Sequence, residues 1–153
     1  MKKVLIVEDE ILARLGLRQL VDWKKLELEL LPDATDGEEA LEMIRNSCPD
    51  IILLDLNIPK VSGLEILEFL KKEEMPTKVI VVSCQEEFDV VKKAMKLGAY
   101  DYLRKLNLSS DELENILEKC LVETEERITV HMQGIREIRY EEIVRDSRDI
   151  LAG

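Results

Sequence analysis

The sequence predicts an α/β protein with a doubly wound parallel sheet, and three observations lead to that prediction. Short apolar runs rich in β-branched residues recur along the chain, and they are continuous rather than alternating, as in strands buried on both faces. Longer segments of helical periodicity separate them, so that strand and helix patterns alternate five times. Right-handed crossovers then limit this order to a doubly wound sheet with helices on both faces.

Five segments carry the strand signal. The three clearest are Val4–Val7, Ile51–Leu54 and Val79–Val82, each a short apolar run. Leu28–Leu31 and Tyr100–Leu103 are weaker, and the second is expected at a sheet edge.

Five helices are expected to follow these strands. Leu12, Leu15, Leu20 and Trp23 recur at helical spacing and predict the first helix over 11–23. The others are a helix opened by Asp36 with Ala40, Leu41 and Ile44 inward, one over 63–72, one over 86–97 ended by Gly98, and one capped by Ser109 or Ser110.

The pattern changes after about Val122, so we predict a main domain over 1–123 and an extension over 124–153. Apolar positions in the extension follow a 4-3 spacing typical of a coiled-coil seam: Leu117, Leu121, Thr124, Ile128, His131, Ile135 and Ile138. A helical extension that forms a dimer contact is one interpretation. A solvated linker is the other, because Thr124, His131 and Gly134 weaken the seam.

Composition indicates a globular protein with an acidic surface. Of 153 residues, 46% are hydrophobic and 36% charged, and the formal net charge is −11. A chain this acidic is poorly suited to grip nucleic acid through its phosphates, which requires clustered Lys and Arg. It suits a divalent cation or a basic partner.

Cysteine usage and hydropathy point to a reducing, cytoplasmic location. Cys48, Cys84 and Cys120 are odd in number and far apart, so they suggest neither a zinc site nor a disulfide framework. The apolar start of the chain is interrupted by Glu8-Asp9-Glu10, too early for a secretion signal. No apolar run reaches membrane-spanning length, so we expect no membrane association.

Chemistry-bearing residues follow the predicted strands at one end. Glu8 and Asp9 follow the first, Asp55 the third, Ser83 the fourth and Lys105 the fifth. The carboxyl ends of parallel strands form the ligand-binding edge of such a sheet, so these residues are expected to converge there.

Three clustered carboxylates require a proton or a cation. At about 4 Å and an effective dielectric near 20, each pair repels by roughly 4 kcal/mol. Oxygen ligands favour magnesium, and Lys105 adds a positive charge. Such a site suits phosphoryl transfer, with Asp55 as the nucleophile, because the loop Leu56–Pro59 can present it to solvent. Asn57 can offer its main-chain carbonyl to the metal.

Each residue taken singly has a simpler explanation. The acids at 8–10 favour a helix dipole, Ser83 can cap a helix, and Lys105 can be a surface charge. Their coincidence at separate strand ends favours one reaction.

Several motifs together resemble a response regulator receiver domain. They are Lys-Val-Leu-Ile-Val-Glu-Asp-Glu at 3–10, Pro-Asp-Ile-Ile-Leu-Leu-Asp-Leu-Asn-Ile-Pro at 49–59, Gly63, Val-Ser at 82–83 and Gly-Ala-Tyr-Asp-Tyr-Leu-Arg-Lys at 98–105. The resemblance covers about residues 1–123 and implies a five-stranded sheet in the order 2-1-3-4-5.

The resemblance also implies roles for individual residues. Asp55 would take phosphate from a sensor kinase histidine, with Lys105 and Ser83 assisting. Ser83 and Tyr102 would form a switch that reshapes the face of the fourth helix, fifth strand and fifth helix. Asn57 and Gln85 would set the lifetime of the phosphate. The metal set implied is Asp9, Asp55, the Asn57 carbonyl and, through a water, Glu8.

One departure concerns Leu106, which stands where the family usually has a cis proline. A cis bond before Leu106 would cost roughly 2.5–4 kcal/mol, so we expect a trans bond and a differently shaped loop. That change puts the reach of Lys105 in question.

Three alternatives are weaker. A phosphatase of the haloacid dehalogenase type needs a second Asp where Asn57 stands. In a flavodoxin-like site, Glu8-Asp9-Glu10 would repel the phosphate of flavin mononucleotide. An inert receiver-like module does not explain the full acid set. The chain is therefore expected to catalyse only its own phosphorylation and dephosphorylation.

A homodimer is expected from the seam-like extension. The resemblance further suggests that the chain is a fragment of a longer transcriptional regulator with an AraC-type DNA-binding domain. A single-domain regulator that acts through protein contact is the alternative.

Overall fold

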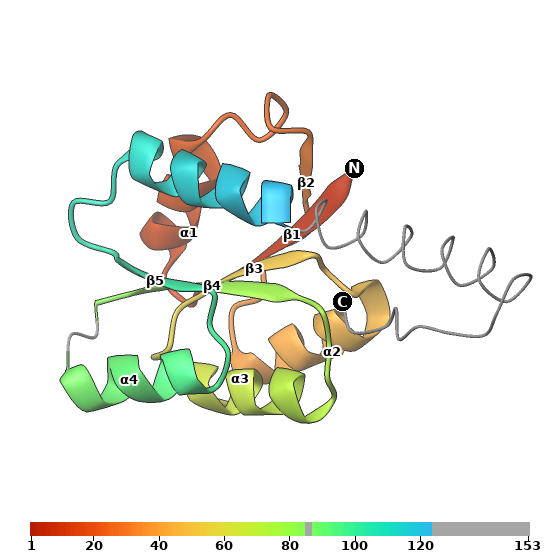
Figure 1. Ribbon diagram of the computed structural model, residues 1–153, viewed down its shortest axis with the longest axis vertical. Coiled ribbons are helices and arrows are strands. Elements are labelled where there is room, and N and C mark those ends of the chain that lie inside the picture. The colour runs from red at the N-terminus through yellow and green to blue at the C-terminus, as the bar shows by residue number, and fades with distance from the viewer. Residues whose placement is uncertain (85–86, 124–153) are drawn as a thin grey trace, which may run out of the picture. The chain divides into compact units, whose positions relative to one another are not determined.

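The computed structural model describes residues 1–84 and 87–123. In that part of the chain, five parallel strands form one sheet in the order β2-β1-β3-β4-β5 (Figure 1), which confirms the predicted fold class and topology. The strands are β1 Lys2–Val7, β2 Leu28–Leu30, β3 Ile51–Leu54, β4 Lys78–Ser83 and β5 Asp101–Arg104.

The helices that connect these strands lie on both faces of the sheet. They are α1 Ile11–Leu20, α2 Gly37–Ser47, α3 Gly63–Lys72 and α4 Phe88–Lys96. Figure 1 shows α2, α3 and α4 on one face and α1 on the other, as a doubly wound sheet requires. A further helix covers 110–123, and Ser109 Oγ accepts a hydrogen bond from Glu112 N at 3.1 Å, so Ser109 rather than Ser110 is its cap.

The central strands are buried along their whole length. All four residues of β3 are at most 2% exposed, and so are the inner residues of β1 and β4. Alternate strand residues join Ala40 and Ile44 of α2 and Ile66 and Leu67 of α3 in one apolar cluster. Burial of both strand faces explains why the strand signals are continuous apolar runs.

The first helix buries other residues than those that the sequence pattern predicted. Leu12 and Leu15 are 83% and 48% exposed, whereas Leu17 is buried. The helix ends at Leu20, and Trp23 is buried beyond that end. The predicted spacing combined residues of a helix with one of the following loop, so the expectation for 11–23 was wrong in extent and in its buried face. Gly98, at φ 99°, adopts the left-handed conformation expected of the residue that ends α4.

The chain separates into two compact units, 1–114 and 115–153. The domain limits at 123 and 124 stay a prediction, and the seam positions from Thr124 onward lie outside the described residues, as does Gln85. Among the described helices, none has the length and apolar character of a membrane span.

Candidate functional site

The sheet register brings the first acid and the predicted nucleophile together. Val7 of β1 pairs with Leu54 of β3, so Glu8 and Asp55 leave neighbouring strands at the same level. The Asp55 N–H continues the ladder and donates to the Val7 carbonyl at 3.0 Å. On the other side of β3, the Lys105 N–H donates to the Ser83 carbonyl at 3.1 Å, which places the fifth strand's lysine beside the fourth strand's end.

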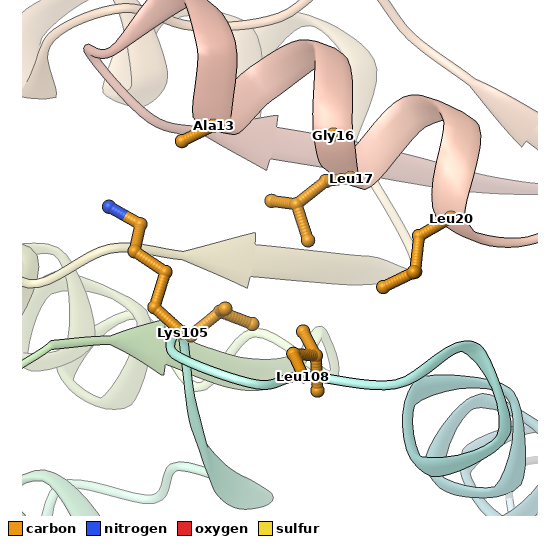
Figure 2. Close-up of a pocket in the computed structure, with 7 residues that line it drawn as sticks. Ala13, Gly16, Leu17, Leu20, Lys105 and Leu108 are labelled. Carbon is orange, nitrogen blue, oxygen red and sulfur yellow. The ribbon is translucent and has the colours of Figure 1, made fainter.

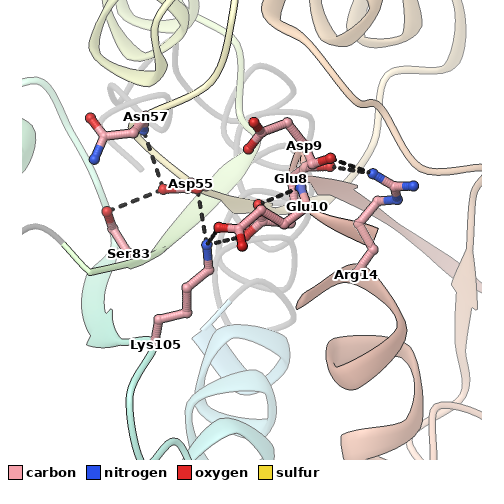
Figure 3. A network of polar contacts seen from close by, with 8 residues as sticks. All are labelled: Glu8, Asp9, Glu10, Arg14, Asp55, Asn57, Ser83 and Lys105. Carbon is pink, nitrogen blue, oxygen red and sulfur yellow. Dashed lines mark hydrogen bonds and ion pairs between the residues drawn. The ribbon is translucent and has the colours of Figure 1, made fainter. Parts of the chain in front are cut away.

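Asp55 is held on both carboxylate oxygens (Figure 3). Its Oδ1 accepts from Ser83 Oγ at 3.2 Å and from Asn57 N at 3.2 Å, and its Oδ2 accepts from Lys105 Nζ at 3.1 Å. The residue is only 5% exposed, so the following loop does not present it to solvent as expected. These contacts orient the side chain inward, toward the hydroxyl and the ammonium group.

Lys105 links the acids of two strand ends. Its Nζ forms ion pairs with Glu8 Oε1, with Asp55 Oδ2 at 3.1 Å and with Glu10 Oε1 at 3.6 Å. Burial alone would lower the pKa of Lys105, but the carboxylates of Glu8 and Asp55 outweigh it and raise that pKa, so the lysine is cationic at neutral pH. No cis peptide occurs in the described residues, so the bond before Leu106 is trans, as expected. The ion pairs with Glu8 and Asp55 show that Lys105 reaches the acids.

Glu8, Asp9 and Glu10 offer carboxylate oxygens that lie within 4.8 Å of one another. Glu8 is 1% exposed, whereas Asp9 and Glu10 are exposed. Burial raises the pKa of Glu8, with a further contribution from the charge of Asp55, and Lys105 and the Glu10 N–H counteract it. The buried Oε1 of Glu8 forms an ion pair with the Lys105 ammonium. A buried carboxylate beside two exposed ones is a set of oxygen donors that fits a hard divalent cation.

The predicted metal set and the clustered acids overlap only in part. Glu8 and Asp9 are common to both, Glu10 joins the cluster, and Asp55 is instead paired with Lys105. Asn57 is exposed, and its N–H rather than its carbonyl contacts Asp55. Tyr102 is half-buried on β5 opposite Val81 and packs against the apolar cluster, so its switch role stays a prediction.

Arg14 is a member of the network that sequence reasoning missed. Its Nη1 donates to the main-chain carbonyls of Glu8 at 3.1 Å and Asp9 at 3.0 Å (Figure 3). A cation in the first turn of a helix opposes the helix dipole. That unfavourable position is the signal in the sequence that could have drawn attention to Arg14.

A shallow apolar pocket of about 210 Å³ lies beside the network. Figure 2 shows the aliphatic part of Lys105 along its wall, with Leu108 below and residues of α1 opposite. The stem of Lys105 borders this apolar hollow and its ammonium group lies at the acids' end, which is the usual arrangement of a half-buried lysine.

Comparison with known proteins gives one family. Residues 4–118 match the family model described as the response regulator receiver domain. An uncharacterised response regulatory protein of Staphylococcus epidermidis is 34% identical over 118 residues, which cover 77% of this chain and 46% of that protein. The uncharacterised transcriptional regulatory protein YesN of Bacillus subtilis is 30% identical over 141 residues, 92% of this chain and 38% of that protein.

A solved structure supports the same relationship. The REC domain of the response regulator AraT from Geobacillus stearothermophilus superposes with a TM-score of 0.74 at 31% identity, covering 82% of this chain and 97% of that one. The present chain spans less than half the length of the two curated relatives named above.

Proposed function

Because the chain belongs to the response regulator receiver domain family, we propose that it is a phosphorylation switch in which Asp55 accepts a phosphoryl group from a sensor kinase phosphohistidine. The observation that carries this proposal is the set of contacts around Asp55. A nearly buried carboxylate lies between an ammonium group and a hydroxyl, next to a cluster of acids. Buried charged groups with specific charge partners cluster at functional sites.

The phosphoryl group passes intact from the donor histidine to Asp55. A carboxylate oxygen of Asp55 attacks phosphorus, the P–N bond of the donor histidine breaks, and its electron pair returns to the imidazole ring. The product is an acyl phosphate on Asp55. Lys105 and Ser83 already contact the two carboxylate oxygens, so each can contact an oxygen of the incoming group with a small displacement.

Magnesium would be held by Glu8, Asp9, Asp55 and the Asn57 carbonyl, with Glu10 as a further candidate ligand. When bound, it neutralises negative charge on the phosphoryl oxygens. Lys105 would then be released from part of its pairing with Glu8 and Glu10, which makes its charge available to the phosphoryl group.

The response to phosphorylation would begin at Ser83 and Tyr102. Ser83 ends β4 and binds Asp55, and Tyr102 lies on the neighbouring strand β5. Movement of the hydroxyl toward the phosphoryl group would let the aromatic ring turn inward and reshape the surface of α4 and β5. Asn57 is placed beside Asp55 and, with Gln85, would set the lifetime of the phosphate.

The output is proposed to be transcriptional. The matched relatives include a protein named as a transcriptional regulator, and the chain covers 38% of it. We infer that phosphorylation controls an AraC-type DNA-binding domain through homodimerisation, while this chain makes no direct contact with nucleic acid. A single-domain regulator that acts by protein contact is the second candidate.

Intact-protein mass spectrometry tests the proposed function. The full chain is incubated with acetyl phosphate and Mg²⁺, and one added phosphoryl group is expected. Asp55→Asn should remove it, whereas Asp89→Asn, which deletes an exposed carboxylate of α4, should not. Absence of phosphorylation in the unmodified chain would favour an inert receiver-like module.

A further inference from the structure

The loop that carries the acids is not held by the usual device at a helix start. Glu10 is the N-cap of α1, and its side chain accepts no capping hydrogen bond. By contrast, Asp36 caps α2 and Ser62 caps α3, each accepting from a main-chain N–H. The Glu8 N–H donates to the Ala34 carbonyl and the Glu10 N–H to Glu8 Oε2, each at 3.0 Å, but neither contact involves the carbonyl groups of Glu8 and Asp9.

Arg14 supports those carbonyl groups from inside the helix. A single guanidinium nitrogen, Nη1, donates to the carbonyl oxygens of both Glu8 and Asp9, at 3.1 and 3.0 Å. These two carbonyls belong to the residues that carry the first two acids. Hydrogen bonds from a charged donor are stronger than neutral ones, so the two contacts resist rotation of the loop.

Asp33 holds the guanidinium from the other side. Its Oδ2 lies 3.8 Å from Arg14 Nε, while its Oδ1 accepts from Arg18 Nη1 at 2.6 Å. Arg14 and Asp33 are both mostly buried, with side chains 18% and 15% exposed. The planar guanidinium uses one edge for the carbonyls and another for the carboxylate, an arrangement that a lysine cannot reproduce.

We propose that Arg14, oriented by Asp33, is a positioning residue for the divalent cation: it fixes the Glu8–Asp9 main chain so that the two carboxylates are arranged for binding before the metal arrives. This inference rests on the proposed function, since it names a determinant of the same site. Loss of a group that orients metal ligands typically weakens metal binding by about 10- to 100-fold.

The direction in which Mg²⁺ affinity changes when Arg14 is removed distinguishes a positioning role from a purely electrostatic one. A guanidinium near three acids repels a dication, so its removal on electrostatic grounds alone would make Mg²⁺ bind more tightly. Positioning predicts the opposite. In the full chain we expect Arg14→Met to raise the Kd for Mg²⁺ about tenfold, measured by isothermal titration calorimetry.

Three further variants complete the experiment. Arg14→Lys keeps the charge but not the two-edged contact, so it should recover only part of the affinity. Asp33→Asn should raise the Kd by a smaller factor than Arg14→Met, because the carbonyl contacts remain. Arg45→Met removes an exposed arginine of α2 that stacks on Phe69, and it should leave the Kd unchanged. At saturating Mg²⁺, the phosphorylation rate of the Arg14 variants with acetyl phosphate should return toward that of the unmodified chain.

The outcomes distinguish this inference from the function on which it rests. A chain that binds Mg²⁺ and is phosphorylated, with the same Kd in Arg14→Met and Arg45→Met, overturns the inference alone. A lower Tm of Arg14→Met with an unchanged Kd also overturns it, since the role is then structural. Should Arg14→Met not fold, unchanged Kd values in both Arg14→Lys and Asp33→Asn overturn it. Failure of the unmodified chain to bind Mg²⁺ overturns both proposals.

Discussion

Two strand-to-helix junctions supply the acids of this site, and they are built differently. The β3–α3 junction carries Asp55 and is closed by main-chain packing. The Gly63 N–H donates to the Leu56 carbonyl at 3.0 Å, and Ser62 and Glu65 form a reciprocal capping box at the start of α3. The loop after Asp55 is therefore closed by residues within ten positions of it, whereas the Asp55 carboxylate itself is oriented by Ser83 and Lys105.

The β1–α1 junction carries Glu8, Asp9 and Glu10, and no side chain caps its helix. Arg14 and Asp33 hold it instead, and Asp33 lies beyond β2, in a different part of the chain. The comparison teaches that the loop after Asp55 is closed by main-chain contacts and a capping box, whereas the carbonyls of Glu8 and Asp9 are held by the Arg14 side chain, which Asp33 orients. Substitutions in the two junctions should therefore have different consequences.

The largest expected effect comes from a substitution in the β3–α3 junction. A Cβ at position 63 would lie 2.6 Å from Leu56 Cα and 2.8 Å from the Asp55 carbonyl oxygen. Both contacts are with main chain that cannot move independently, so Gly63→Ala should lower the free energy of unfolding by about 3 kcal/mol, at the upper end of overpacking costs. Urea denaturation measures this.

Gly16→Ala is the matched control in α1. Nothing lies within 4 Å of a Cβ at that position, and alanine is the better helix former. A gain of about 0.5–1 kcal/mol is expected. A loss of similar size in both variants would contradict the account of Gly63.

The second effect concerns Lys105, which joins the two junctions through Asp55 and Glu8. Lys105→Met leaves two buried carboxylates without their cation. Since the lysine side chain is 16% exposed, the loss should be about 2 kcal/mol, below the cost of breaking a fully buried pair. Mg²⁺ should restore a larger share of stability to this variant than to the unmodified chain, as thermal denaturation with and without Mg²⁺ would show. Equal Mg²⁺-induced increases in Tm for the two chains would contradict this prediction.

A third, smaller effect has the opposite sign. Burial raises the pKa of Glu8, so the folded chain binds more protons than the unfolded chain above the ordinary pKa of 4.5. Stability from this group is complete below that pH and is lost as pH rises through the folded-state pKa. Glu8→Gln should therefore stabilise the metal-free chain at pH 7, by on the order of 1 kcal/mol.

The gain from Glu8→Gln should shrink as pH falls and should vanish below 4.5, where glutamate becomes protonated in both states. The same variant should bind Mg²⁺ more weakly. Thermal unfolding across pH 4 to 8 provides the measurement. A stability gain from Glu8→Gln that grows toward low pH would contradict the prediction.

The smallest effect sharpens the comparison. Ser62→Ala removes the side chain that accepts from Glu65 N at 3.2 Å and should cost about 1 kcal/mol of stability. Its Kd for Mg²⁺ should change little, because the acids at 8–10 are held by other groups and the Asp55 carboxylate is oriented by Ser83 and Lys105. A changed Mg²⁺ affinity, measured by calorimetry, would show that the two junctions are not independent.

Much of this architecture could be predicted from the sequence, because it depends on local patterns. The buried strands are continuous apolar runs, and their order places Glu8, Asp55 and Ser83 at one edge. The exposed Leu12 and Leu15 were not predicted, since helical spacing does not distinguish one face of α1 from another.

The remaining features depend on three-dimensional packing. The contacts of Arg14 with two carbonyls, and of Asp33 with Arg14, join residues whose spacing follows no motif. The burial of Asp55 was likewise missed, and its carboxylate contacts Lys105, which lies fifty positions away in the sequence. Side-chain reach of this kind is decided by the fold.

The most direct test of the central claim locates the phosphoryl group chemically. After reaction with acetyl phosphate and Mg²⁺, borohydride reduces an acyl phosphate to an alcohol, which converts the modified aspartate to homoserine. Peptide mass spectrometry should then find homoserine at position 55, and only in chains treated with acetyl phosphate and Mg²⁺ before the borohydride. Homoserine at Asp9 or another aspartate, with position 55 unmodified, would contradict the assignment of Asp55 as the acceptor.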